Sequence, residues 1–147
     1  MRDKKDRNSF IAGAILPQFI GESIARHSTN AKIGAHSIFL GQVRNDLVGI
    51  KEVMAIEYTT YKELAEEKIY EIREAIFLKY GLTCLHIYHS LGKVNVGEIC
   101  LFVFTSSIRR KDAIVACEEL VESIKKEVPI WGKEIFENDE YQWKSNS

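Results

Sequence analysis

Hydrophobic residues along the chain follow two different spacings, one typical of strands and one typical of helices. Short apolar runs predict strands at residues 35–40, 53–58, 84–90 and 98–104. Gly41 is expected to end the first of these strands, and a loop containing Gly92 and Gly97 is expected to link the last two. Two further strand-like pieces, 130–136 and 141–143, lie on either side of a turn-prone Asn-Asp pair.

Two long segments have the 3.6-residue spacing of amphipathic helices. The first covers residues 61–79, and Gly81 follows it in the position of a C-terminal cap. The second follows Ser106 and Ser107, either of which is a suitable N-terminal cap, and it ends before Pro129. The predicted apolar stripe of this second helix consists of Ile114, Cys117, Val121, Ile124 and Val128.

A shorter helix is expected to begin at Pro17, because proline is favoured at the first helical position. The mixture of strands and helices predicts an α+β fold. We expect a single domain over residues 1–147, since 147 residues are an ordinary size for one domain. Residues 1–8 are expected to be weakly ordered, as chain termini often are.

The composition limits the kinds of partner that this domain can bind. Apolar residues make up 46% of the chain, enough to fill a core, and the formal net charge is −1. A nearly balanced charge argues against a general nucleic-acid binder, whose domain is usually strongly basic. Any anion site must therefore be local and built by a few placed cations.

The cysteines and histidines do not predict a metal site. Cys84, Cys100 and Cys117 form no C-x-x-C pair and leave one over, so neither a disulfide framework nor a zinc site is indicated. His36 and His86 lie in strand patterns without metal-ligand spacing and are interpreted as structural. His89, at the end of a predicted strand, is interpreted as polar for solubility only.

The chain has no apolar stretch approaching the roughly 20 residues of a membrane span, and no signal-peptide core follows its charged start. A protein of the reducing cytoplasm is therefore expected.

Three cations, Arg109, Arg110 and Lys111, stand at the start of the second long helix. The partial positive charge of a helix N-terminus disfavours cations there. Together with free backbone N–H groups, these side chains suit a phosphate group. Solvation beside Asp112 is the alternative, and the spacing alone does not decide between the two.

Lys125 lies in the last turns of the same helix, where an ordinary surface lysine paired with Glu122 is one interpretation. To act as a nucleophile or base, Lys125 needs its pKa lowered by burial or by neighbouring cations. Arg44 follows a strand and suits either a ligand or a salt bridge. Residues 131–134 offer a tryptophan for packing, a glycine that permits close approach, and a lysine–glutamate pair.

Taken together and in this order, the segments resemble the large subunit of molybdopterin synthases over about residues 33–143. The stretches that carry the resemblance are 41–45, Glu57-Tyr58, 89–92, 96–98, 106–110, Ala113, Ala116-Cys117, Lys125 and 129–134.

The resemblance implies a fold of the α/β hammerhead type, with a mostly antiparallel sheet and two long helices packed on it. It implies a homodimer in which each copy binds a small ubiquitin-like sulfur-carrier subunit, giving a heterotetramer. The implied activity is a sulfurtransferase reaction in molybdenum cofactor biosynthesis. Sulfur passes from the C-terminal Gly-Gly thiocarboxylate of the small subunit to cyclic pyranopterin monophosphate, also called precursor Z, and forms the dithiolene of molybdopterin. Neither a metal nor a cofactor is implied, nor a nucleic-acid or membrane partner.

The resemblance also implies the roles of individual residues. Catalytic roles fall on Lys125 and Lys133. Substrate-binding roles fall on Gln42, Val43, Arg44, Arg109, Arg110, Lys125, Gly132, Lys133 and Glu134.

Two positions depart from the family pattern. Arg109 stands where the family usually has a histidine, so the charge persists but a group that titrates near neutral pH is lost. Gly132 stands where the family has a lysine. Either the neighbouring Lys133 takes over that role, or the second lysine is dispensable, or activity is weakened.

Two other functions remain open at this point. The first is a non-catalytic paralogue that keeps only dimerisation and partner binding, for which Gly132 is the main reason. The second is a small-ligand or RNA-binding α+β module. RNA binders usually add exposed aromatic residues on a strand face and a basic surface, and neither pattern is found here.

Overall fold

The computed structural model describes residues 8–144. Of the segment 1–8 that was expected to be weakly ordered, residues 1–7 fall outside the described residues, as do residues 145–147. The strands are β1 Phe10–Ala12, β2 Ala35–Gln42, β3 Leu47–Val48, β4 Lys51–Thr60, β5 Cys84–Asn95, β6 Ile99–Ser107, β7 Ile130–Phe136 and β8 Tyr141–Trp143. The helices are α1 Pro17–His27, α2 Lys62–Tyr80 and α3 Arg110–Glu127, with a short 3-10 turn, η2, at Glu137–Asp139.

Within residues 8–144 the eight strands form one sheet with the order β2-β6-β5-β4-β7-β8. Neighbouring strands along this path run antiparallel, β3 adds to β4, and β1 pairs with β5 in parallel. The predicted α+β class with a mostly antiparallel sheet and two long helices is therefore confirmed.

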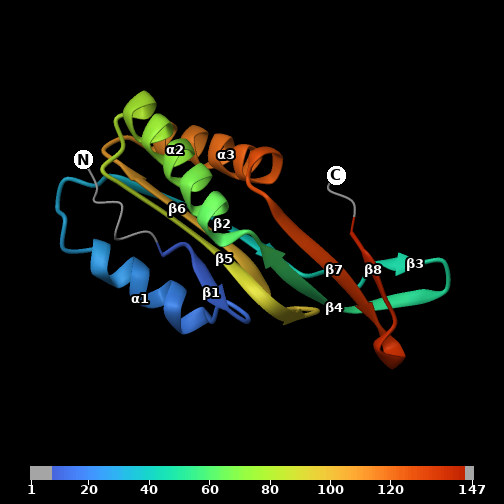
Figure 1. Cartoon of the computed structure of the whole chain (residues 1–147). Coiled ribbons are helices and arrows are strands. Elements are labelled where there is room, and N and C mark those ends of the chain that lie inside the picture. The colour runs from blue at the N-terminus through green and yellow to red at the C-terminus, as the bar shows by residue number, and fades with distance from the viewer. Residues whose placement is uncertain (1–7, 145–147) are drawn as a thin grey trace.

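The two faces of the sheet carry different helices. Figure 1 shows α2 and α3 on one face and α1 on the other. The main core fills the space under α2 and α3, where Leu85, Ile87 and Val103 point inward. A smaller cluster of Ile15, Ile20, Phe102 and Phe104 lies on the α1 face. Side chains on a strand alternate between the faces, so β5 and β6 contribute to both cores.

Helix α2 follows its sequence signals closely. The apolar residues at helical spacing in this segment share its buried face, and none of them is more than 7% exposed. They are Ala65, Ile69, Ile72 and Ile76. Gly81 adopts a left-handed conformation with φ 58°, and its N–H donates to the carbonyl of Phe77. Glycine is favoured at this position because a side chain strains that conformation.

The predicted start of α3 is wrong, and so is one position of its predicted apolar stripe. Cys117, Ile124 and Val128 are buried as expected, and Val121 packs partly buried against the core. Ser106 and Ser107 belong to β6, and Arg109 is the N-cap residue without a side-chain hydrogen bond. Ile114 is 55% exposed. The buried residues of α3 are Ala113, Ala116, Cys117, Leu120 and Ile124. Two alanines that are fully buried allow the helix to lie close against the sheet, so the small residues face inward and Ile114 faces outward.

The predicted loop around Gly92 is also wrong, because β5 runs on to Asn95. The first part of β5 pairs with β6 through His89, and the last part pairs with β4 from Gly92 onward. Gly92 has a φ of 85° at the point where the strand changes its partner. The glycine therefore marks a bend within the strand.

The remaining predictions of elements are confirmed. Helix α1 begins at Pro17, α3 ends before Pro129, and Asn138 and Asp139 form a turn with positive φ between β7 and β8. The short strands β1 and β3 were not predicted, since each contributes only a few residues. In the part of the chain that the structure describes, no helix is long and apolar enough to cross a membrane.

Gly34 provides a test of the packing between the start of β2 and the end of β6. A Cβ at this position would lie 2.1 Å from the carbonyl oxygen of Ile108. Gly34→Ala should therefore lower the free energy of unfolding by about 2 kcal/mol or more, because backbone has to move. Gly21 on α1 has open space around it, and Gly21→Ala should raise stability by about 0.5–1 kcal/mol. Urea unfolding of both variants measures this, and equal stabilities would contradict the packing described.

Candidate active site

A pocket of about 610 Å³ lies where the C-terminal half of α3 meets β4, β5 and β7. Its lining residues are Phe39, Tyr58, His89, Val121, Glu122, Ile124, Lys125, Lys126, Val128, Ile130, Gly132 and Lys144. The lining contains three lysines and a single carboxylate, so the pocket has a local excess of positive charge. It is therefore suited to an anionic ligand although the whole chain is nearly neutral.

Lys125 is the lysine of this pocket whose pKa is lowered. Desolvation by the surrounding structure lowers the pKa of its ammonium, and the charge of Lys144 acts in the same direction. The nearby thiol of Cys100 opposes both effects. A lysine with a lowered pKa has a larger neutral fraction, which is the form that acts as a nucleophile or a base.

Lys144 reaches the pocket through the backbone. It follows β8, and its N–H donates to the carbonyl of Gly132 over 2.8 Å. This bond holds the residue beside the pocket even though its side chain is exposed. Two segments far apart in the chain, α3 and the end of β8, thereby bring their lysines to one site.

His89 forms part of the inner wall of the pocket and is only 3% exposed. Nδ1–H of its ring donates to the carbonyl of Ser90 over 2.8 Å, and the ring meets Tyr58 edge-on at 4.9 Å between centroids. Burial lowers the pKa of His89 to about 4, and the charge of Lys125 adds to this effect. The imidazole is therefore neutral at physiological pH and keeps Nε2 as a hydrogen-bond acceptor.

Tyr58 lies between His89 and Gly132 in the wall of the pocket. Burial raises the pKa of its phenol, and its side-chain hydrogen bond with Cys100 acts in the same direction. Tyr58 pairs with Gly132 in the ladder between β4 and β7. A Cβ at position 132 would approach Cγ2 of Ile56 to 3.0 Å and the Tyr58 ring to 3.4 Å, so the wall is closely packed where the family has a lysine.

The residues around Gly132 point to opposite faces of β7. Gly132 and Glu134 are buried, and Glu134 accepts a hydrogen bond from Gln142 over 3.1 Å. Lys133 lies on the other face, 3.2 Å from a carboxylate oxygen of Glu57 and 4.6 Å from the centre of the Tyr141 ring. Within one copy of the chain, Lys133 therefore does not line the pocket of Lys125.

The predicted residues after β2 are also separate from this pocket in one copy. Arg44 is exposed and pairs with Asp46 over 3.3 Å. Val43 is a core residue, only 2% exposed, and Gln42 is an exposed residue at a β-bulge opposite Ile99. Of the residues predicted to bind substrate, Lys125 and Gly132 line the pocket.

Arg109 and Arg110 lie at the opposite end of α3 from Lys125 and are exposed. Lys125 lies fifteen positions after Arg110, which is about 22 Å along a helix that rises 1.5 Å per residue. These arginines and Lys125 of one copy are too far apart to contact the same small ligand.

The sequence did not single out Tyr58, His89, Lys126 or Lys144 as pocket residues, although Tyr58 and His89 lie in stretches that carry the resemblance. One signal for His89 was available: it continues the alternation of Leu85 and Ile87, which are buried on the face under α2 and α3. The position of Lys144 depends on a hydrogen bond between distant segments, for which the sequence contains no local signal.

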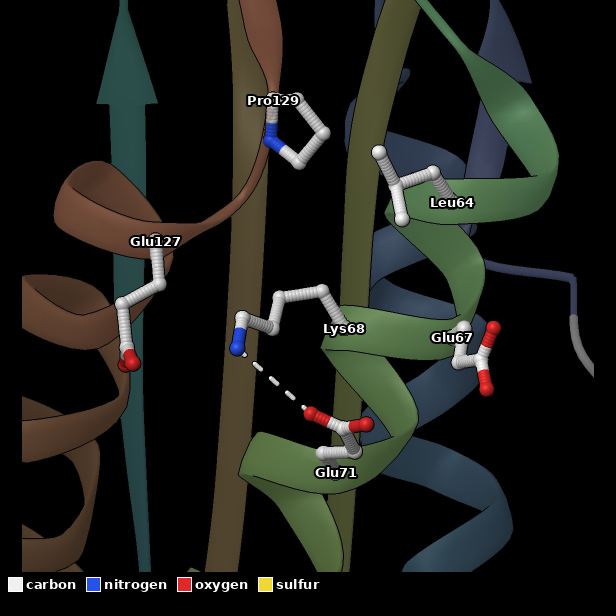
Figure 2. A pocket seen from close by; sticks show the side chains of 6 residues that line it. All are labelled: Leu64, Glu67, Lys68, Glu71, Glu127 and Pro129. Carbon is white, nitrogen blue, oxygen red and sulfur yellow. Dashed lines mark ion pairs between the residues drawn. The ribbon is translucent and has the colours of Figure 1, made fainter.

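A second groove, of about 260 Å³, lies between α2 and α3 and is shown in Figure 2. Glu67, Glu71 and Glu127 line it together with Lys68, Leu64 and Pro129. Lys68 is already paired with Glu71 over 3.5 Å. This groove has an excess of negative charge, so the Lys125 pocket is the better candidate for an anionic substrate.

Comparisons with known proteins identify the family to which this chain is similar. The model of the family described as "MoaE protein" matches residues 17–127. The molybdopterin synthase catalytic subunit of Rattus norvegicus is 37% identical over 113 residues, which are 77% of this chain and 56% of that relative. This chain therefore spans little more than half the length of the rat protein.

Two solved structures have the same fold. The crystal structure of molybdopterin synthase from Staphylococcus aureus matches with a TM-score of 0.82 and 31% identity, over 95% of this chain and 98% of that one. A complex of subunits 1 and 2 of the molybdopterin-converting factor from Helicobacter pylori matches with a TM-score of 0.80, over 93% of this chain and 89% of that one. At 20% identity, the second likeness shows the fold alone.

The buried His89 predicts a loss of stability in acid. Its pKa is about 4 in the folded chain and 6.5 in the reference state, so the unfolded chain takes up the proton first as the pH falls. The stabilising contribution is complete above the unfolded pKa, and about 2–3 kcal/mol of it is lost between pH 7.5 and pH 4.5. His89→Phe should show a correspondingly smaller loss in urea unfolding at the two pH values. The same loss in both proteins would mean that His89 is not buried in its neutral form.

Proposed function

This chain belongs to the MoaE protein family, and from that premise we propose that it is the catalytic large subunit of a molybdopterin synthase. It transfers sulfur from the C-terminal thiocarboxylate of a small ubiquitin-like subunit to cyclic pyranopterin monophosphate. The observation that carries the proposal is the pocket in which Lys125, with its lowered pKa, lies beside Lys126 and Lys144. Cations that surround one reactive lysine suit a phosphorylated substrate and an anionic sulfur donor.

Each sulfur transfer forms one carbon–sulfur bond and breaks another. The thiocarboxylate sulfur bonds to a carbon of the pterin side chain, while the carbon–oxygen bond of that carbon breaks and the departing oxygen takes up a proton. Water then cleaves the acyl–sulfur bond, leaves the tail as a carboxylate and releases a proton. Lys125 assists the attack, as an acid–base or through a transient covalent bond to the substrate. Two such transfers produce the dithiolene.

The neutral His89 and the phenol of Tyr58 form the inner wall beside Lys125. Because the imidazole is uncharged, it adds no further repulsion to a site that already contains three lysines. Its Nε2 accepts a hydrogen bond, which gives the wall a means to orient either the Lys125 amine or a polar group of the substrate.

We assign Arg109 and Arg110 to the substrate phosphate of the site on a second copy of the chain. The reason is their separation of about 22 Å from Lys125 along α3, which one small ligand does not span. In a two-fold dimer, the start of α3 from one copy can approach the end of α3 from the other. Arg44 also contributes to anion binding. Its side chain is exposed and forms an ion pair with Asp46.

Lys133 has a different assignment from Lys125. Its ammonium lies on the opposite face of β7, against Glu57 and Tyr141. We assign it to the carboxylate of the partner's C-terminal tail, with the exposed Tyr141 and Trp143 beside it. The Helicobacter pylori complex, whose fold this chain shares, supports a second subunit as the partner. A reducing compartment such as the cytoplasm fits three cysteines that are all unpaired.

One observation favours a second candidate, a non-catalytic paralogue that binds the partner without turnover. Gly132 replaces the family lysine, and the space for a side chain there is limited by Ile56 and Tyr58. The two candidates differ in a direct assay. Mixing the chain with a thiocarboxylated small subunit and the cyclic pterin gives dithiolene product only if the chain is catalytic.

Lys125→Ala should lower product formation by about 100-fold or more, because the reactive amine is removed from the pocket. Binding of the small subunit should persist, since Lys125 is one side chain of a large surface. Lys62→Ala on α2 is the matched control, because Lys62 is exposed and does not line the pocket. Turnover near wild type in Lys125→Ala would remove the proposed role.

Mixed dimers test whether the two copies share a site. Arg110→Ala and Lys125→Ala chains should each be nearly inactive alone at limiting substrate. If the site combines residues of both copies, their mixture should recover about a quarter of wild-type activity, since half of the dimers contain one intact site of two. Refolding the two variants together and assaying product measures this recovery. No recovery above the separate variants would place both residues in a site made by one copy.

A further inference from the structure

A second cluster of reactive side chains lies on the face of the sheet opposite the Lys125 pocket. Cys84 and His86 are two residues apart on β5, so both point to the face that α1 covers. His27 is the last residue of α1, and its ring lies 4.8 Å from that of His86 between centroids. One potential ligand atom from each of the three residues lies within 4.8 Å of the other two.

The ring of His27 is already oriented as a metal ligand would be. Its Nδ1 lies 2.6 Å from the carbonyl oxygen of Ser23, which can only accept, so Nδ1 carries the proton. The other nitrogen, Nε2, then has a lone pair, which accepts a hydrogen bond from Nε2–H of His86. Histidine ligands commonly fix their tautomer by donating the other ring N–H to a backbone carbonyl. The His27 ring also rests on the fully buried Phe104, at 4.8 Å between centroids.

The spacing of the two imidazoles is close to that of a shared metal ion. Nε2 of His27 and Nε2 of His86 are 2.9 Å apart. Two nitrogens bound to tetrahedral zinc at about 2.0–2.1 Å lie about 3.3 Å apart. The rings therefore need to separate by only about 0.4 Å to admit the ion.

Cys84 adds a sulfur donor from the same strand. It is unpaired and half-buried, and burial raises the pKa of its thiol. Metal binding displaces the thiol proton into solvent and leaves the His86 ring neutral, with its proton on Nδ1. His27 and His86 are also half-buried, so the cluster is supported by the core but open to an ion from solution.

We propose that His27, Cys84 and His86 form a zinc-binding site with one thiolate and two imidazole ligands. Borderline-soft divalent ions such as Zn²⁺ prefer this donor set, and three protein ligands leave a fourth position for water. The spacing of these residues in the sequence carries no zinc signal, because His27 and His86 are 59 residues apart and meet only through the packing of α1.

The site would fix α1 to the sheet. Only Ile20 and Ser23 of this helix are buried, so α1 has few apolar contacts to hold it in place. A metal that joins the last residue of α1 to β5 stabilises the folded chain by mass action. This role is independent of sulfur transfer, which takes place on the opposite face of the sheet.

Titration of the full-length, metal-stripped chain with Zn²⁺ alone tests the proposal. We expect one ion per chain in competition with a chromophoric chelator, and a higher Tm in its presence. Replacement by Co²⁺ gives a readout that needs no variant. A thiolate-to-cobalt charge-transfer band together with the visible bands of tetrahedral cobalt is expected for this donor set.

Three variants identify the ligands. Cys84→Ser, His27→Gln and His86→Gln should each weaken Zn²⁺ binding by about 100-fold or more and abolish the rise in Tm. His36→Gln is the matched control. His36 lies on the same face with its ring 6.4 Å from that of His27, but its Nδ1 is bonded to Ser106 and it is not part of the cluster.

Three results would overturn the zinc site. The first is the absence of stoichiometric binding by the unmodified chain. The second is a Co²⁺ spectrum without a thiolate band, which does not depend on the folding of any variant. The third is equal Zn²⁺ affinity in His36→Gln and in the three ligand variants, which is the behaviour of adventitious surface binding.

Discussion

The alternation of side chains along β5 is the constraint on which the rest of the structure depends. Leu85, Ile87 and His89 point under α2 and α3, whereas Cys84 and His86 point under α1. A shift of the strand by one residue would exchange the two sets. One register therefore places His89 in the wall of the pocket and Cys84 and His86 beside α1. The pairing of β5 with β6 fixes this register through six consecutive residue pairs from Cys84 to His89.

Close packing of α3 on the sheet places Lys125 beside the residues that this register sets under the helix. Ala113 and Ala116 are fully buried, so the helix axis approaches the sheet, and Thr105 donates its hydroxyl proton to the carbonyl of Ala113 over 2.7 Å. The far end of the helix then lies above His89, and Lys125 becomes partly desolvated there. Larger residues on the inner face would move Lys125 away from the wall and return its ammonium to bulk water.

Local signals in the sequence were sufficient for the elements but not for the pocket. The sequence predicted the helical spacing of α2, the glycine that follows it and the end of α3 before Pro129. Each of these signals is read from residues that are close together in the chain. The start of α3 was placed wrongly because Ser106 and Ser107 are good caps in isolation, yet both are needed in the ladder with β2. Lys144 and Tyr58 reach the pocket through pairing between distant strands, which composition and spacing do not encode. The length of the predicted helix already implied that Arg110 and Lys125 lie far apart, so the two residues can serve one site only if that site combines two copies of the chain.

The charges around the pocket suit an anion although the whole chain is nearly neutral. Burial lowers the pKa of both Lys125 and His89, so the surroundings of these two groups disfavour their charged forms compared with bulk water. An anion bound beside Lys125 would oppose the lowering of its pKa, because a nearby negative charge favours the protonated form of a lysine. His89 is almost fully buried and is much less accessible to such a charge. A bound anion would therefore stabilise the ammonium of Lys125 and leave His89 neutral.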